Sequence, residues 1–561
     1  MNICRLLLLA ALPGLVSGTL LANPAPAATA AADRTRFIRT PPPPSSPRIN
    51  GPRIFGARPG HPFFYHLPVT GERPFTITAS GLPAGLTLDA ATGNITGAVD
   101  KAGEFDAAFT ATNAKGTDRT TLRIVIGDNI CLTPPMGWNS WNYFNMRVTA
   151  GDIRAAADAM VATGMIDHGW TYVNLDDGWA GGRDDQGRIL PKANFPDMKG
   201  MADYVHGKGL KFGIYTTPGP ITCGHLPGSL GHEALDVASY AAWGVDYLKY
   251  DGCTITEISK IYTAEEYAKL LPESAAELIR LGKEAADLTL KFYNHIPGKK
   301  PGDKNRLNEI SKRVDELHAA VPQEKRAQIA MEIAQRPWRQ MRPILDAVER
   351  DIVYSISQGG RAEIWKWGGE IGANLWRVST DIGASWKSVE SHGFAQADDG
   401  LEKWAGPGRW NDPDMLEIGN GKLTPDECYT HMTMWCVLGA PLLIGCDMTK
   451  MDAFTTSLFC NDEVLAVNQD RLGRQGCRVR KDGEREVWTK PLADGSLAVA
   501  LCNRGGTAAE VAVTWNDLKL TGPQVVRDLW RQKDIGELAT GHAVMVAPHG
   551  AELFRIAQTQ K

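Results

Sequence analysis

Apolar residues in the middle of the chain come in short continuous runs, separated by segments with helical spacing. Runs that are apolar on both faces are typical of parallel strands buried between helices. Six runs lie between about residues 129 and 470: "WTYVNLDD" (170–177), "LKFGIYTT" (210–217), "VDYLKYDG" (245–252), "DIVYSIS" (351–357), "LWRVSTD" (375–381) and "PLLIGCD" (441–447). With "TPPMGWNSW" and "RWNDPDML" the count reaches eight, the number of strands in a (β/α)8 barrel.

A helix is predicted between the first two of these strands. Thr149 and Asp152 have the spacing of a capping box. The apolar face that follows is formed by Ile153, Ala156, Ala157, Met160 and Val161. The strand and helix alternation therefore predicts a (β/α)8 TIM barrel over residues 129–470.

Residues 254–350 break this alternation. They are rich in Ala, Leu, Glu, Lys and Arg and predict several helices, interrupted near "HIPGKKPGDKN". We interpret this interval as a helical insertion after the fourth strand, because a structureless loop of that length is uncommon. Two functions remain open for it: a solvated decoration, or a wall around the entrance on the active face of the barrel.

The segments on either side of the barrel have the alternation of β-structure. Residues 49–128 contain short alternating runs spaced by Gly, Asn and Asp, which predicts a β-sandwich. The text "GLPAGLTLDAATGNITG" resembles the immunoglobulin-like modules of bacterial exported proteins. Residues 471–561 predict an antiparallel C-terminal β-sandwich. The fold class is thus multidomain, with a catalytic barrel between two β-domains.

The N-terminus has the features of an export signal. Arg5 precedes an apolar run, and small residues follow near Ala25 and Ala27. We predict a signal peptide at 1–27 and a Pro-rich linker at 28–48, and expect a periplasmic or extracellular protein. The sequence predicts no membrane span, because no other run reaches about 18 apolar residues.

Composition excludes several classes of function. The 561 residues carry a formal charge of -4, which gives no overall field to attract nucleic acid or an anionic membrane.

The chain has ten cysteines, and nine remain when the one in the predicted signal peptide is left out. Because nine is an odd number, at least one thiol is free or pairs between chains. The twelve histidines show no HExxH spacing, so no catalytic metal is predicted.

Polar side chains follow the predicted strands at the end where a barrel of this type carries its active site. Lys249 and Asp251 are two residues apart on one strand, so both can point into one cavity. Asp251 and Asp381 come from different strands and are candidates for the two carboxyl groups of retaining glycoside hydrolysis. The pattern alone does not divide their roles, and an ordinary acidic rim remains an alternative. Asp412 and Asp414 are interpreted as structural supports.

Seven motifs in consistent order resemble glycoside hydrolase family 27, the family of α-galactosidases and α-N-acetylgalactosaminidases. They are "TPPMGWNSWNYF", "VNLDDGW", "FGIYTTPG", "WGVDYLKYDGC", "WRVSTDIGASWKSV", "AGPGRWNDPDMLEIGN" and "APLLIGCDM". The resemblance implies an exo-acting retaining glycosidase without a cofactor. It identifies Asp251 as the nucleophile and Asp381 as the general acid and base.

The resemblance also implies how the sugar is bound. It places six residues around the sugar: Trp141, Asp176, Asp177, Tyr215, Lys249 and Arg377. Within this set the Asp176 and Asp177 pair accepts hydrogen bonds from the O4 and O6 hydroxyls. The family also joins the cysteine of "DGC" to one in the preceding loop, here Cys253 and Cys223.

The fifth strand departs from the family pattern. Typical α-galactosidases of the family have a Cys-Glu-Trp segment there, whereas this chain has "YSISQGG". The small residues Ser357, Gly359 and Gly360 resemble the α-N-acetylgalactosaminidase arrangement, with Ser357 as a substrate contact. The resemblance predicts terminal α-linked galactose as substrate. N-acetylgalactosamine, a pentopyranose, or a catalytically inactive carbohydrate-binding protein remain alternatives, although the Asp176 and Asp177 pair speaks against the pentopyranose. The oligomeric state is not predicted.

Overall fold

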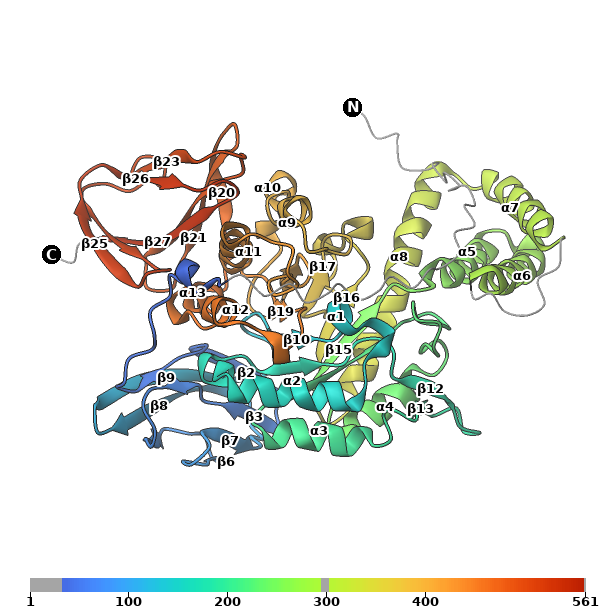
Figure 1. The fold of residues 1–561 in the computed structure, drawn as a ribbon. Coiled ribbons are helices and arrows are strands. Elements are labelled where there is room, and N and C mark those ends of the chain that lie inside the picture. The colour runs from blue at the N-terminus through green and yellow to red at the C-terminus, as the bar shows by residue number, and fades with distance from the viewer. Residues whose placement is uncertain (1–32, 294–301, 559–561) are drawn as a thin grey trace.

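The computed structural model describes residues 33–293 and 302–558, and a closed barrel lies at its centre (Figure 1). The predicted signal peptide lies outside the described residues. All eight predicted strands are present and parallel, and the sequence order is followed round the sheet. Leu416 closes the barrel by bridging to Ile444. The strands are β10 (Met136–Asn139), β11 (Tyr172–Asn174), β14 (Lys211–Thr216), β15 (Tyr247–Asp251), β16 (Val353–Ser357), β17 (Leu375–Arg377), β18 (Trp410–Asp412) and β19 (Leu442–Ile444).

The predicted first helix of the barrel is α2 (Ala150–Ala162), and it begins with the expected capping box of Thr149 and Asp152. Four of its five predicted core residues are buried. Val161 is 37% exposed, because its position eight residues after Ile153 places it about 80° round the helix from that residue. Other helices packed around the barrel are α3 (Met198–Gly207), α4 (Glu233–Trp243), α9 (Trp386–Gly393), α11 (Pro425–Leu438), α12 (Ala453–Phe459) and α13 (Asp462–Asn468).

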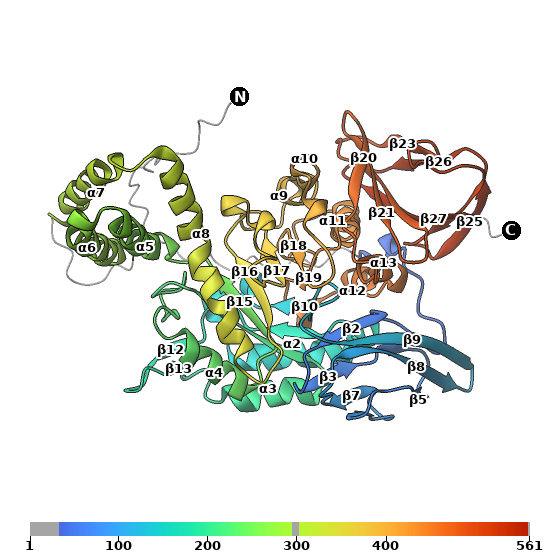
Figure 2. The same ribbon diagram turned by 180° about the vertical axis from the view of Figure 1, so that it is seen from behind.

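The helical insertion projects away from the C-terminal domain, and the two lie at opposite ends of the molecule in both views (Figures 1 and 2). Its helices are α5 (Ile255–Leu270), α6 (Ala275–Tyr293), α7 (Asp303–Ala319) and α8 (Gln323–Asp346). Part of the predicted interruption, 294–301, lies outside the described residues. The second half of α8 belongs to the barrel: Trp338 is buried, and its ring lies 5.7 Å from that of Tyr250 on β15.

The N-terminal domain is a sandwich of two sheets with a core of its own, as the sequence predicts. One sheet has the order β2 (Ile54–Ala57), β9 (Gly116–Ile126), β8 (Gly103–Asn113), β5 (Thr76–Ser80); the other has β3 (Phe63–His66), β7 (Asn94–Gly97), β6 (Leu86–Leu88). This domain contacts the end of the barrel where the strands begin. Arg58 forms an ion pair of 2.8 Å with Asp351, just before β16. The sandwich therefore lies away from the strand ends that carry the candidate chemistry.

The C-terminal domain is antiparallel, as predicted. Its six-stranded sheet has the order β20 (Cys477–Asp482), β21 (Arg485–Pro491), β22 (Leu497–Asn503), β27 (Ala551–Gln558), β24 (Gln524–Asp528), β25 (Lys533–Leu538), and the pair β23 (Ala509–Thr514) and β26 (Gly541–Val546) completes it. Apolar side chains of both layers form a separate core.

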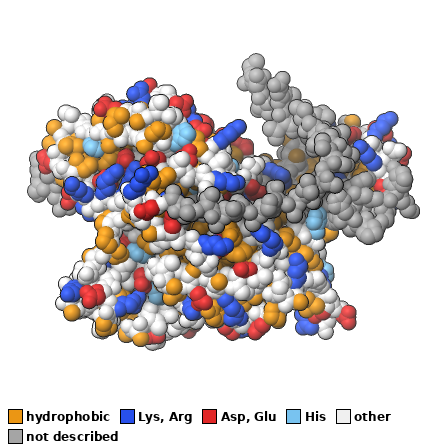
Figure 3. Space-filling model, in the orientation of Figure 1, with side chains coloured by type: hydrophobic (Ala, Val, Ile, Leu, Met, Phe, Trp, Pro, Cys, Tyr) orange, Lys and Arg blue, Asp and Glu red, His pale blue; other side chains and the backbone are white. Residues whose placement is uncertain are grey.

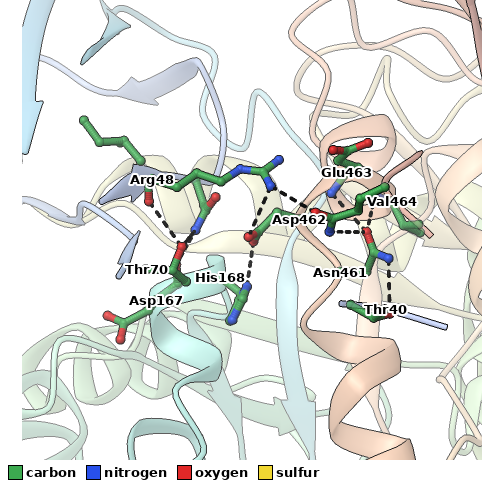
Figure 4. A network of polar contacts seen from close by, with 12 residues as sticks. Thr40, Arg48, Thr70, Asp167, His168, Asn461, Asp462, Glu463 and Val464 are labelled. Atoms are coloured by element: carbon green, nitrogen blue, oxygen red, sulfur yellow. Dashed lines mark hydrogen bonds and ion pairs between the residues drawn. The ribbon is translucent and has the colours of Figure 1, made fainter. Parts of the chain in front are cut away.

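One polar network joins the N-terminal domain to the barrel (Figure 4). His168, just before β11, forms a 2.6 Å hydrogen bond with Asp462 on α13, and Arg48 of the short strand β1 (Arg48–Ile49) lies 3.9 Å from the same carboxylate. Neighbouring Asn461 donates to Thr40, in the segment predicted as a linker. Thr40, in the described part of that segment, is therefore buried against the barrel. The domain boundaries themselves stay predictions.

The surface carries mixed charge. Lys, Arg, Asp and Glu side chains are interspersed over the face seen in Figure 3. Throughout 33–293 and 302–558, each helix is too short or too polar to cross a lipid bilayer.

Candidate active site

A cavity of about 630 Å³ lies where the barrel strands end. Both candidate catalytic residues, Asp251 and Asp381, line this cavity although they are far apart in sequence. The predicted site residues on the cavity wall are Trp141, Asp176, Tyr215, Lys249, Asp251, Arg377 and Asp381. Asp177 and Ser357, in contrast, do not line it.

Lys249 connects two acidic side chains of the site. Its Nζ donates a 2.8 Å hydrogen bond to Asp176 and lies 3.9 Å from Asp251. The alternation along β15 produces this arrangement, because residues two apart share one face of a strand. Asp176 also accepts a 2.8 Å hydrogen bond from Asn139 at the end of β10, so the carboxylate is fixed from two strands.

The environment of Asp251 acts on its pKa in two directions. The pKa of Asp251 is raised to about 6, chiefly by burial and further by the carboxylates of Asp176 and Asp381, while the charges of Lys249 and Arg377 lower it. The two cations thus partly offset desolvation and favour the ionised form that a nucleophile needs. A raised pKa of this kind is common among the groups of functional sites.

Asp381 lies at the solvent side of the cavity, where 91% of its side chain is exposed. Arg377 donates a 3.2 Å hydrogen bond to it and forms a 2.9 Å ion pair with Asp414. The same Asp414 oxygen accepts from the backbone N–H of Ile382, next to Asp381. Asp414 therefore supports the segment that carries Asp381, and Asp412 accepts from the backbone of Asp414. These contacts are consistent with the supporting role predicted for both aspartates, and Asp414 also lines the cavity.

Asp177 is buried beside the cavity instead of lining it. Its two oxygens accept 2.8 Å and 2.7 Å hydrogen bonds from the backbone N–H groups of Gly178 and Gly224. Burial raises its pKa above the ordinary value for aspartate. The two neighbouring aspartates thus have different roles. Asp176 faces the cavity, and Asp177 holds the 217–232 loop against the end of β11 through its hydrogen bond from Gly224.

Tyr215 and a disulfide form the wall next to Asp251. Cys223 and Cys253 are joined, with Cα atoms 5.2 Å apart. The Tyr215 hydroxyl lies 3.0 Å from the sulfur of Cys253. Because Cys253 follows Asp251 by two residues, the disulfide fixes the end of β15 to the loop after β14.

Ser357 is the register partner of Asp251 on the neighbouring strand. Its side chain is 5% exposed, and its carbonyl oxygen accepts a 2.7 Å hydrogen bond from the N–H of Gly252. Ser357 therefore supports the turn after Asp251 through its backbone. The predicted contact between its side chain and a substrate is not reproduced as a contact with the cavity.

Several residues on the cavity wall were not expected from the sequence. They come from the short helix α1 (Trp141–Phe144), from the residue after it, and from the segment after β18: Asn142, Tyr143, Asn145, Met415, Glu417, Asn420 and Lys422. A signal for the second group was available, because Met415, Glu417 and Asn420 all lie within the motif "AGPGRWNDPDMLEIGN". Among the described residues, no group of three His, Cys, Asp or Glu side chains is arranged to hold a metal ion.

Comparison with known proteins agrees with this geometry. The family model described as "Alpha galactosidase A" matches residues 133–278 and 327–470, leaving out much of the helical insertion. Models of the α-galactosidase C-terminal β-sandwich domain and of an Ig domain match residues 482–556 and 46–127.

Individual proteins match over most of their length. "Alpha-galactosidase 2" of Arabidopsis thaliana is 35% identical over 456 residues, 80% of this chain and 96% of the relative. A Bacteroides fragilis crystal structure has a TM-score of 0.75 at 34% identity and covers 94% of this chain and 99% of its own. α-Galactosidase I from Mortierella vinacea has a TM-score of 0.60 at 28% identity, covering 76% and 97%. The chain belongs to the α-galactosidase family, glycoside hydrolase family 27.

Proposed function

We propose that this protein removes terminal α-linked galactose from oligosaccharides or glycoconjugates, with retention of configuration. The observation that carries the proposal is one cavity lined by both Asp251 and Asp381, with a cation beside each carboxylate. Relatives that are named α-galactosidases at 34–38% identity support galactose as the sugar.

In the first step an oxygen of Asp251 attacks the anomeric carbon. The bond from that carbon to the glycosidic oxygen breaks, and Asp381 donates its proton to the departing oxygen. Lys249 and Arg377 support this step because their charges lower the pKa of Asp251 and favour the ionised nucleophile.

In the second step Asp381, now a carboxylate, takes a proton from water. The water oxygen attacks the anomeric carbon, the bond to Asp251 breaks, and galactose leaves in the α configuration. The exposure of Asp381 gives water direct access to it. Trp141, Asp176 and Tyr215 surround the sugar in this proposal.

The test is a rate assay on p-nitrophenyl α-galactoside and p-nitrophenyl α-N-acetylgalactosaminide. Asp251→Asn keeps the shape of the side chain and removes the nucleophile, so turnover should fall by about 10⁴-fold or more. Asp185→Asn, at an exposed position between β12 (Ala180–Arg183) and β13 (Ile189–Pro191) that does not line the cavity, is the matched control. Faster turnover of the N-acetylgalactosaminide than of the galactoside would overturn the galactose assignment. If the wild type hydrolyses neither substrate, an inactive carbohydrate-binding protein would be favoured.

Export and a periplasmic or extracellular location belong to the same proposal. They rest on the signal-like residues 1–27. Detection of a mature N-terminus after about residue 27 in secreted material would support them.

A further inference from the structure

A buried glutamate, Glu417, lies in the wall of the active-site cavity and has no part in the mechanism above. It follows Leu416, the residue that closes the barrel: Leu416 N donates to Leu443 O at 2.7 Å, and Gly445 N donates to Leu416 O at 3.0 Å. Successive side chains of an extended segment point to opposite faces. Met415 and Glu417 therefore both face the cavity.

The carboxylate of Glu417 holds two asparagines from different parts of the barrel. Asn142 on α1 donates to Oε1, and Asn420 donates to Oε2 at 2.5 Å. Glu417 is 4% exposed, and burial raises its pKa, while the two amide hydrogen bonds lower it. Burying a carboxylate costs folding free energy unless it is hydrogen-bonded, so Glu417 favours the conformation in which both amides donate to it. The three side chains are therefore expected to hold one another in place as one unit.

Part of each amide remains available to the cavity. Glu417 uses one N–H of each asparagine, so one N–H and the carbonyl oxygen of each are left. These groups have no side-chain partner among the described residues, and both asparagines line the cavity. Paired donors and acceptors of this kind match sugar hydroxyls, each of which can donate and accept a hydrogen bond.

The position of the unit relative to Asp381 indicates which sugar it meets. Asp176 and Tyr215 lie at the closed end and are 2% exposed. Asp381, which gives its proton to the glycosidic oxygen, is at the exposed rim. The leaving group therefore extends toward the rim. Asn142 and Asn420 are half-buried and lie beside the exposed Lys422 and Asn145.

We propose that Glu417 is a positioning residue that holds Asn142 and Asn420 as a binding subsite for a sugar leaving group. A leaving group that is a hydroxyl-rich sugar should then gain binding from Asn142 and Asn420 that a leaving group without hydroxyls does not. This inference rests on the proposed α-galactosidase function, and it adds a positioning residue and two contacts to the leaving group.

The test compares melibiose, whose leaving group is glucose, with p-nitrophenyl α-galactoside, whose leaving group has no hydroxyls to recognise. Glu417→Gln replaces one of the two accepting oxygens with an NH₂ group. One asparagine therefore loses its acceptor and is no longer held in position. The ratio of kcat/KM for melibiose to that for the nitrophenyl substrate should fall about tenfold, mainly through KM of melibiose. Glu510→Gln, the same change on the exposed strand β23, should leave the ratio unchanged.

A double-mutant cycle separates positioning from a purely structural role. If Glu417 acts through the amides, Glu417→Gln should add little to the loss of selectivity already caused by Asn142→Ala with Asn420→Ala. An equal loss on both substrates, accompanied by a lower melting temperature, would overturn the inference, as would an unchanged ratio. Wild-type protein that hydrolyses neither substrate would instead overturn the proposed function.

Discussion

The ammonium group of Lys249 lies 3.9 Å from the carboxylate of Asp251, on the same face of one barrel strand. This pairing partly offsets the burial that raises the pKa of Asp251 to about 6.

The relationship between Lys249 and Asp251 predicts a pH dependence. Because the nucleophile must be ionised, kcat/KM should decline below about pH 6, approaching a tenfold loss for each further pH unit. Lys249→Met removes a charge that lowers the pKa of Asp251, so the acidic limb should move to higher pH. The measurement is a pH profile of kcat/KM for both proteins, and an unchanged limb in the variant would contradict the role of Lys249.

The two carboxyl groups on the cavity wall predict the stereochemistry of the product. A retaining reaction requires a gap of about 5 to 5.5 Å between Asp251 and Asp381 when substrate is bound. Galactose should therefore appear first as the α-anomer, before mutarotation. Proton NMR of the anomeric signals in the first minutes of hydrolysis gives the answer, and initial release of β-galactose would mean that water attacks directly.

Asp414 should be needed for activity although it is proposed only as a support. Asp414→Asn removes the charge that pairs with buried Arg377, and asparagine tolerates the positive φ of 89° at this position. Loss of one partner of a buried ion pair costs about 3 kcal/mol of folding stability. Displacement of the Asp381 segment should lower kcat about a hundredfold. Kinetics together with urea unfolding test both effects, and full activity would exclude this supporting role.

His168 predicts a stability change in alkaline solution. Burial lowers its pKa, but the hydrogen bond to Asp462 and the influence of Cys460 outweigh burial and raise the pKa to about 10. The protonated form is therefore bound more tightly in the folded state. Its contribution is fully present below the unfolded pKa of about 6.5 and is lost as pH rises through about 10.

The size of this contribution is about 2 kcal/mol, the value of a buried hydrogen bond between charged groups. Thermal melting of the wild type should lose more stability between pH 7 and pH 10 than melting of His168→Gln. Parallel curves for the two proteins would show that the pair does not titrate in this range.

The disulfide between Cys223 and Cys253 should matter for catalysis more than for overall folding. It joins two loops on the wall next to Asp251, and small displacements of a nucleophile can reduce rates by up to about a hundredfold. Mild reduction, or Cys223→Ser with Cys253→Ser, should lower kcat by at least about tenfold while the far-UV circular dichroism is retained. Cys477→Ser, at a free cysteine of the C-terminal domain, is the control.

The sequence by itself determined the architecture and predicted the two carboxyl groups that line the cavity. Each barrel strand is a short apolar run, since strands covered on both faces must be apolar along their whole length. The spacing of Lys249 and Asp251 also needed no coordinates, because strand alternation puts them on one face.

Only the tertiary structure separated neighbours of like chemistry. Asp176 faces the cavity, whereas Asp177 accepts hydrogen bonds from the backbone N–H groups of Gly178 and Gly224. Their difference depends on how a loop from another strand packs, and no local pattern encodes that packing. The Glu417 unit was missed for the same reason, since its two asparagines are brought together by barrel closure through residues more than 270 positions apart. Local periodicity fixes which face of an element a side chain occupies, and long-range packing decides what that side chain meets.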